Sequence, residues 1–181
     1  MKEKREEIKM SNKISVILDL FNQGFKMIEL YGINEQGNCT CYKGSECNCA
    51  GKHPVKPKWQ ENYIKSVDEL PEILKQRPLA NFGIITGEGL VVIDVDARHG
   101  GLESLQEIKD LVEPTMTVKT GGGGYHFYYS VDGTVKNRTN VFKGIDVRGD
   151  GGYVVAPGSK HKSGNFYTIE KENNNENDRE N

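Results

Sequence analysis

The apolar residues recur with a helical period in three stretches of the chain. Those at positions 14, 17, 18 and 21 follow the i, i+3, i+4, i+7 spacing of one helix face, and Gly24 is placed to end that helix. Ser66 and Glu69 have the spacing of a capping box, which predicts a helix over residues 66–76. A third apolar face at helical spacing predicts a helix over residues 102–112.

Shorter apolar runs between turn residues predict a series of strands. Gly87-Glu88-Gly89 separates two of these runs, and so short a glycine-rich link predicts a hairpin between them. We expect strands at 25–33, 81–86, 90–96, 115–119 and 165–169, one that starts at His126, and two short ones within 144–157.

The strand at 90–96 ends in two acids. Side chains alternate between the faces of a strand, so Asp94 and Asp96 project from the same face. Two carboxylates at the end of a buried strand repel each other unless water or a cation reaches them, and their hard oxygens suit Mg²⁺ or Mn²⁺. Taken alone, the pair is equally typical of a surface Asp-x-Asp without function.

A run of four glycines at 121–124 precedes the strand that starts at His126. Glycine backbone can approach a ligand closely and offer N–H groups to an anion. No Gly-Lys-Ser/Thr follows, so the run is not a P-loop. A flexible hairpin turn is the alternative interpretation. A glycine run that delivers a histidine to a strand edge is nevertheless more specific for a binding site than glycines alone.

All four cysteines lie between positions 39 and 49, and His53 follows them. Thiolate and imidazole ligands placed around turns suit tetrahedral Zn²⁺. Five candidates compete for four places, so one is not expected to be a ligand. The loop at 37–54 has almost no apolar residues to fold it, so a structural metal would supply the missing stability. A flexible loop with free thiols is the alternative.

Composition and charge narrow the class of protein. A length of 181 residues with 35% apolar residues suggests one domain. The net charge of −2 does not indicate whether the protein binds nucleic acid, but residues 119–162 hold seven basic and three acidic side chains, and this positive excess can bind phosphate.

Without a long apolar run or a signal-peptide pattern, we expect a cytoplasmic protein whose cysteines are reduced. The charged N-terminus, 1–12, is expected to be flexible, and the Asn- and Glu-rich tail, 170–181, disordered.

Three motifs follow one another along the chain. They are Asp94-Val-Asp96-Ala-Arg-His-Gly-Gly, Lys119-Thr-Gly-Gly-Gly-Gly-Tyr-His126 and Gly144-Ile-Asp146-Val-Arg-Gly-Asp-Gly-Gly-Tyr-Val-Val-Ala-Pro. Together they resemble the bifunctional DNA primase/polymerase N-terminal domain (prim-pol) of the archaeo-eukaryotic primase superfamily. Gly51-Lys-His-Pro54 with its upstream cysteines, and Asn81-Phe-Gly-Ile-Ile-Thr-Gly87, are also similar to that family. The resemblance covers residues 13–169, and the family is common in phages, plasmids and integrated elements.

The resemblance implies a fold and a set of site residues. The fold is α/β (α+β), with an RRM-like antiparallel sheet of archaeo-eukaryotic primase type that carries the acids and helices packed behind it. Asp94, Asp96 and Asp146 match the family's metal-binding acids, and His126 matches its histidine that contacts the triphosphate. The family commonly shows three cysteines and a histidine in its zinc-binding loop. This favours the set Cys39, Cys41, Cys47 and His53, with Cys49 as an additional candidate.

The implied activity is template-directed nucleotidyl transfer from (d)NTPs in the replication of a phage, plasmid or other mobile element. Two Mg²⁺ or Mn²⁺ ions about 4 Å apart would neutralise the attacking and leaving oxygens, held by the three shared carboxylates. From their proximity to the motifs, we expect the triphosphate to contact Gly122, Gly123, Gly124, Lys119 and Arg148. The implied partners are a single-stranded DNA template, a primer, nucleoside triphosphates and, as in many relatives, a replicative helicase, but no membrane.

Other classes of protein also use such residues, among them metal-dependent transferases and phosphatases with an Asp-x-Asp pair. A haloacid-dehalogenase-type phosphatase would place its nucleophilic Asp near the N-terminus before Thr or Val and Gly-Thr, whereas Ala97-Arg98-His99 follows this pair. A non-catalytic nucleic-acid-binding module would use the cysteine loop and the basic residues, and its acids would affect no turnover. A rolling-circle nickase would need a His-x-His pair, and His126 is followed by Phe127 and Tyr128.

Overall fold

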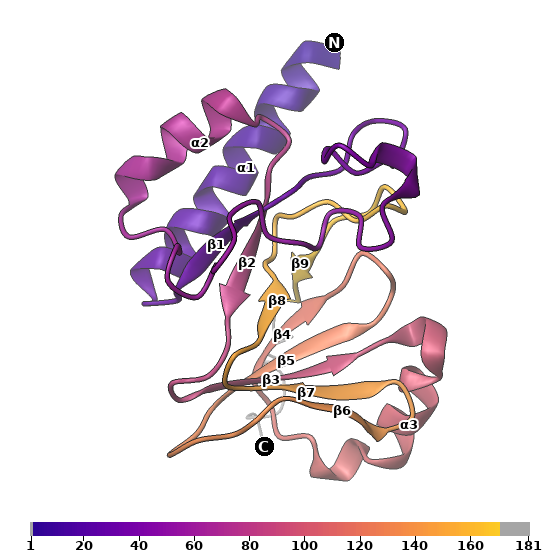
Figure 1. The fold of residues 1–181 in the computed structure, drawn as a ribbon. Coiled ribbons are helices and arrows are strands. Elements are labelled where there is room, and N and C mark those ends of the chain that lie inside the picture. The colour runs from indigo at the N-terminus through magenta and orange to yellow at the C-terminus, as the bar shows by residue number, and fades with distance from the viewer. Residues whose placement is uncertain (1, 171–181) are drawn as a thin grey trace, which may run out of the picture.

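Two antiparallel sheets organise the computed structural model, which describes residues 2–170 (Figure 1). The small sheet has the order β1-β2-β8, and the large sheet has the order β6-β7-β3-β5-β4-β9. The strands of the small sheet are β1 (Met27–Leu30), β2 (Asn81–Ile85) and β8 (Tyr153–Val155). Those of the large sheet are β3 (Leu90–Val95), β4 (Met116–Lys119), β5 (Tyr125–Ser130), β6 (Arg138–Phe142), β7 (Ile145–Arg148) and β9 (Thr168–Ile169).

Helices are few and lie at the two ends of the molecule in Figure 1. They are α1 (Lys2–Asn22) and α2 (Leu70–Gln76), beside the small sheet, and α3 (Gly101–Glu107), beneath the large one. Four short 3₁₀ turns accompany them in the described part of the chain: Gly44–Glu46, Val67–Glu69, Ala97–His99 and Lys109–Leu111. The result is a mixed α+β fold with antiparallel sheets. The RRM-like, primase-type arrangement implied by the resemblance stays a prediction.

The first two predicted helices are present. Gly24, with φ of +87°, follows the end of α1 as its position indicated. The capping box is also confirmed, because Ser66 Oγ accepts a hydrogen bond from the Asp68 N–H and the Glu69 carboxylate accepts one from the Ser66 N–H. α1 includes much of the stretch 1–12, whose flexibility stays a prediction. Of the predicted tail at 170–181, all but the first residue lies outside the described residues.

The predicted hairpin between β2 and β3 is wrong. β2 pairs with β1 on one edge and β8 on the other, whereas β3 pairs with β5 and β7, so no edge is free for the two to meet. The link between them contains three residues with positive φ, Gly87, Glu88 and Gly89, which carry the chain from one sheet into the other. A single isolated bridge, Gly87 to Leu90, is what remains of the expected turn.

The third predicted helix is shorter than 102–112 and buries a different face. α3 ends at Glu107, and Leu102 remains 39% exposed. The buried residues of α3 are Gly101 and Ser104, because the helix approaches the large sheet through small side chains. Ser104 Oγ donates to the Lys143 carbonyl, and a Cβ on Gly101 would lie 2.5 Å from the carbonyl oxygen of Gly144. Apolar spacing therefore indicated the helix correctly but not its contact surface.

One face of the large sheet contributes to the main core at one end and carries the acids at the other. Val92, Val118 and Tyr128 are buried with α1 and the small sheet, where Leu20 and Phe82 are also inaccessible. Two residues further along the strands, the same face carries Asp94 beside His126. β6 was not predicted, because all five of its residues are exposed and give no apolar signal.

None of the helices in residues 2–170 is long and apolar enough to cross a membrane.

The glycine turn that precedes β5 is packed against the backbone of β3. Thr120 accepts hydrogen bonds from Gly123 and Gly124 and donates one to the Gly124 carbonyl, so the turn is closed by its own backbone. Gly124 is buried, and a Cβ there would lie 1.9 Å from the carbonyl oxygen of Val95. Only a residue without a side chain lets β5 begin this close to β3.

We therefore expect Gly124→Ala to destabilise the fold by about 3 kcal/mol, since the backbone it meets cannot move aside as a flexible side chain could. Gly122→Ala is the matched control from the same turn. Its Cβ would lie 3.7 Å from the His161 ring, an ordinary contact, and its effect should stay within about 1 kcal/mol. Urea denaturation of both variants measures the difference, and equal midpoints would contradict this account of the turn.

Candidate functional site

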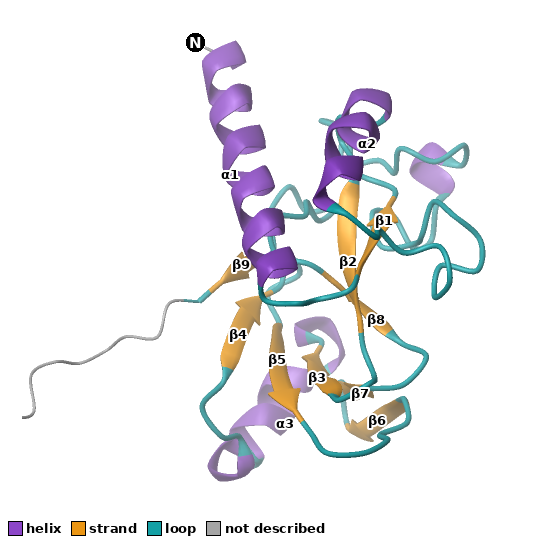
Figure 2. Ribbon diagram, turned by 90° about the vertical axis from the view of Figure 1, so that its left-hand side faces the viewer, coloured by secondary structure: helices purple, strands orange, loops and turns teal. Residues whose placement is uncertain are grey.

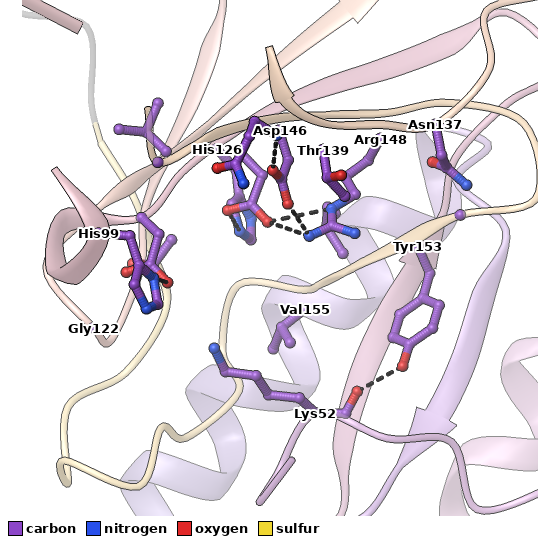
Figure 3. A pocket seen from close by; sticks show the side chains of 18 of the residues that line it. Lys52, His99, Gly122, His126, Asn137, Thr139, Asp146, Arg148, Tyr153 and Val155 are labelled. Carbon is purple, nitrogen blue, oxygen red and sulfur yellow. Dashed lines mark hydrogen bonds and ion pairs between the residues drawn. The ribbon is translucent and has the colours of Figure 1, made fainter. Parts of the chain in front are cut away.

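Strand register brings residues of all three motifs together. On β3, Asp94 lies directly opposite His126 of β5 on one side and Asp146 of β7 on the other. Residues directly opposite in antiparallel strands share a face, so the three side chains form a row across the large sheet. Asp96 follows the end of β3. All four residues line a cavity of about 820 Å³, whose other wall includes Tyr153 and residues of β8 (Figure 3).

Arg148 and His126 contact the acids of the row. The Arg148 guanidinium donates to Asp146 Oδ2 at 2.7 Å and to Asp94 Oδ2 at 3.2 Å, so one side chain bridges both carboxylates (Figure 3). His126 Nε2 lies 3.4 Å from the other oxygen of Asp94. Burial acts to raise the pKa of Asp94, but His126 and Arg148 outweigh it and the pKa is lowered. Asp94 is therefore a carboxylate at neutral pH.

Asp96 has a separate set of partners. It caps the short turn Ala97–His99, accepting from the Arg98 N–H at 2.9 Å and from the Arg98 guanidinium at 3.0 Å. His99 Nδ1 also lies 2.9 Å from its carboxylate. Burial opposes these contacts, but they hold the pKa of Asp96 well below its usual range. Asp96 is therefore also ionised at neutral pH.

The three acids offer the donor type that Mg²⁺ or Mn²⁺ prefers, three carboxylates facing one cavity. Their side chains, however, are each turned toward the chain's own cations, and they do not converge into a ligand group in the described residues. Arg148 and Arg98 therefore provide the positive charge that a metal would otherwise bring. The residues fit such ions in chemistry and in position on the sheet, with side-chain rotation needed to bind them.

The structure brings only some of the predicted nucleotide-binding residues into the cavity. Gly122, His126 and Arg148 line it. Gly123 is exposed, and Gly124 is buried against β3, so neither lines the cavity. Lys119 is also exposed and, by alternation, projects from the face of β4 opposite to that of Val118, which pairs with His126. The predicted contacts of Gly123, Gly124 and Lys119 with nucleotide remain predictions that this placement does not support.

Several residues of the cavity were not singled out from the sequence. Asn140 on β6 donates its N–H to Asp146 Oδ1 at 2.8 Å and so helps to hold that acid. Lys143, beyond β6, and Lys52, from the end of the cysteine loop, add two further cations. Membership of the motif Gly51-Lys-His-Pro54 was the one sequence feature that could have indicated Lys52 as a site residue. The β6 residues had no such feature, because an exposed polar strand has the same sequence pattern as any surface segment.

The cysteine loop forms a second cluster. Among the described residues, one group of three or more Cys, His, Asp or Glu side chains has ligand atoms within 4.8 Å of one another, and it consists of Cys39, Cys41, Cys47 and His53. His53 Nε2 lies 3.4 Å from Cys39 Sγ and 3.5 Å from Cys47 Sγ. Cys49 is exposed and outside the cluster. These four residues are the set that the resemblance favoured.

Two members of this cluster, Cys41 and His53, have pKa values shifted toward their metal-binding forms, whereas burial raises the pKa of the Cys39 and Cys47 thiols. Burial acts to raise the pKa of the Cys41 thiol, but hydrogen bonds with the Lys43 backbone and with the neighbouring thiols outweigh it and lower the pKa. Burial and then the charge of Lys43 lower the pKa of His53, so its imidazole is neutral at neutral pH. Neutral imidazole and thiolate are the forms that bind Zn²⁺. Three sulfurs and one nitrogen are also the composition of a closed structural zinc site.

Comparison with known proteins identifies the family of the chain that carries these two clusters. A search of curated proteins gave no match. The family model described as "Bifunctional DNA primase/polymerase, N-terminal" (Prim-Pol) matches residues 17–179, which is most of the chain and includes the acids, His126 and the cysteine loop. The chain therefore belongs to the bifunctional DNA primase/polymerase N-terminal family, whose members are in general nucleotidyltransferases that act on DNA and nucleotides.

Proposed function

We propose that this protein is a DNA primase/polymerase that joins nucleotides from (d)NTPs to a growing strand on a single-stranded DNA template. The observation that carries the proposal is the row of Asp94, His126 and Asp146 across three adjacent strands, facing one cavity with Asp96 at its edge. A non-catalytic nucleic-acid-binding module would have no need to place three acids around one cavity. The replication of a phage, plasmid or other mobile element, with a replicative helicase as partner, is the setting we infer from the family.

Asp94, Asp96 and Asp146 would hold two divalent cations, Mg²⁺ or Mn²⁺. Bound there, these ions would supply charge neutralisation for the attacking 3′-oxygen and for the leaving pyrophosphate. The acids are ready for this role without losing protons, because Asp94 and Asp96 are already ionised at neutral pH. No side chain needs to act as a nucleophile, since the primer hydroxyl does.

Arg148 and His126 would then exchange partners. In the structure, Arg148 contacts Asp146 and Asp94, and His126 contacts Asp94. Cations that bind the carboxylates would compete with these contacts, and the freed guanidinium and imidazole would face the triphosphate in the same cavity. Arginine suits this role because its planar fork binds phosphate in a bidentate manner. Gly122 also lines the cavity, and its backbone would allow the phosphates to approach closely.

We infer that the cluster of Cys39, Cys41, Cys47 and His53 holds a structural Zn²⁺. It lies in the loop at 37–54, which contains one short 3₁₀ turn and little apolar surface. Zinc would supply the stability that this loop lacks. The ion would not take part in the reaction, because a closed Cys₃His site leaves no open coordination position.

The metal-binding role of the acids is tested by Asp96→Asn. Asparagine keeps the oxygen that caps Ala97–His99 but removes the charge, so we expect nucleotide incorporation to fall at least about 100-fold while the protein stays folded. The assay follows labelled dNTPs and rNTPs on single-stranded DNA in Mg²⁺ or Mn²⁺. Arms with and without a primer separate extension from de novo priming.

The matched control is Asp132→Asn, which removes the same charge from an exposed position outside the cavity. It should retain full incorporation. If Asp96→Asn also retained full activity, the acids would have no catalytic role and the non-catalytic module would be the better interpretation.

The zinc site is tested by comparing two cysteines of one loop. Purified protein should carry about one equivalent of zinc, and Cys41→Ser should lose it because the site is left with three ligands. Cys49→Ser, outside the cluster, should keep its zinc. Metal analysis under reducing conditions measures both, and hydrogen exchange should show loosening of residues 37–54 only in Cys41→Ser. A metal-free wild-type protein would refute the site.

The role of His126 is tested with His126→Ala. The imidazole is only 5% exposed and packs against Tyr167, so the variant should melt at a lower temperature as well as losing a phosphate contact. Below its melting temperature, we expect dNTP affinity to fall roughly tenfold and single-stranded DNA affinity to stay within about twofold. A variant that melted early but bound dNTP normally would show that the residue only supports the strand.

A further inference from the structure

Lys52 occupies a fixed position where the cysteine loop meets the cavity. The residue before it, Gly51, is buried, and its carbonyl accepts a hydrogen bond from Asn81 Nδ2 at 2.9 Å. The carbonyl of Lys52 itself accepts one from the hydroxyl of Tyr153 at 2.9 Å. His53, a member of the Cys₃His cluster, follows directly. The backbone is thus held on both sides, and Figure 3 shows the side chain extending from it into the cavity.

The amine of Lys52 has no partner of its own within residues 2–170. Arg98 and Arg148 each form ion pairs with a carboxylate of the site, but the side chain of Lys52 makes no hydrogen bond or ion pair with any described residue. Its side chain is nevertheless only partly exposed. Asp94 and Asp96 attract this amine across the cavity, but neither forms an ion pair with it. Withdrawing an ammonium group from water without a paired counter-charge is unfavourable, so a cation left in this position favours an anionic ligand.

The wall around Lys52 is positive, in contrast to the row of acids. His161 is buried behind the glycine turn, and a Cβ on Gly122 would lie 3.7 Å from its ring. Burial, and then the charges of Lys52, Arg98 and Lys162, lower the pKa of His161 to about 4, against a smaller opposing effect of Asp96. The imidazole is therefore neutral at neutral pH. Burial is the main cause of the low pKa, and among the charges that act on His161 the effect of each of the three cations exceeds that of Asp96.

We propose that Lys52 binds the outer phosphates of the incoming nucleoside triphosphate, with the cysteine loop serving to place its amine opposite the acids. This inference rests on the proposed function. A triphosphate whose reacting end lies at the acid row would extend its remaining negative charges into the cavity, where the amines of Lys52 and Lys143 have no ion-pair partner among the described residues. Of these two residues, Lys143 is exposed and Lys52 only partly so. The phosphates of a DNA strand have the same chemistry. A partly buried side chain within a cavity suits a small ligand better than a strand that runs along the surface.

The test compares Lys52→Met with Lys56→Met in the full chain. Methionine keeps the apolar stem and removes the charge, and neither backbone hydrogen bond at this position involves the Lys52 side chain. Lys56, four residues further along the same segment, is exposed and does not line the cavity, so it is the matched control. The probes are dATP, dAMP and a single-stranded oligonucleotide, each titrated in Mg²⁺, with zinc content and melting temperature measured on the same samples.

We expect Lys52→Met to bind dATP about 10- to 100-fold more weakly, the loss typical of one charge-assisted phosphate contact, with dAMP affinity within about twofold of wild type. Oligonucleotide affinity, zinc content and melting temperature should be unchanged, and Lys56→Met should match wild type throughout. Unchanged dATP affinity in Lys52→Met would overturn the inference. So would an equal loss for dATP and dAMP, or a loss for the oligonucleotide alone. A wild-type protein that binds no dATP would instead overturn the proposed function itself.

Discussion

The placement of two carboxylates on adjacent strands is the constraint on which the site depends. Asp94 and Asp146 lie directly opposite each other and both face a cavity that is partly closed to water. Two like charges about 4 Å apart repel by about 4 kcal/mol at an effective dielectric constant of roughly 20. Charge-assisted hydrogen bonds contribute about 1.5–3 kcal/mol each, so the bridging contacts of Arg148 are of the size needed to offset this repulsion. The same repulsion is what would make the site receptive to divalent cations.

Glycines and small residues let the backbone come close enough to build this site. Gly124 sets the start of β5 against Val95, which fixes His126 beside Asp94 two residues later. Gly101 and Gly144 meet in the same way beneath the large sheet, where a Cβ on either would clash with backbone atoms of the other or its neighbours. Gly124 and Gly101 are needed because a side chain would have no space there, and not for their backbone angles, since neither has a positive φ.

The cysteine loop and the acid cavity are connected through a short segment of chain. His53 belongs to the Cys₃His cluster, and Lys52 before it reaches the cavity. Tyr153 links this segment to β8 through its hydrogen bond to the Lys52 carbonyl. A structural metal in the loop would therefore contribute to the nucleotide site through the position of one side chain, although it lies outside the reaction. Loss of metal and loss of nucleotide affinity are expected to be linked for this reason.

Local pattern determined the elements that carry their own signal. The capping box at Ser66, the helix stop at Gly24 and the strand with Asp94 at its end could be read from the sequence, because each depends on neighbours within a few residues. The resemblance supplied the identity of the acids and of His126, and it favoured the four residues that cluster in the cysteine loop.

Only the tertiary structure decided which strands are neighbours. β2 and β3 follow one another in the chain but lie in different sheets, since each already has partners on both edges. Three other features could not be predicted from the sequence. They are the face of α3 that packs on the sheet, with Gly101 and Ser104, the exposed strand β6, and the position of Lys52 in the cavity. Strand pairing and side-chain reach depend on contacts between residues far apart in the chain, and such contacts leave no periodic signal in the sequence.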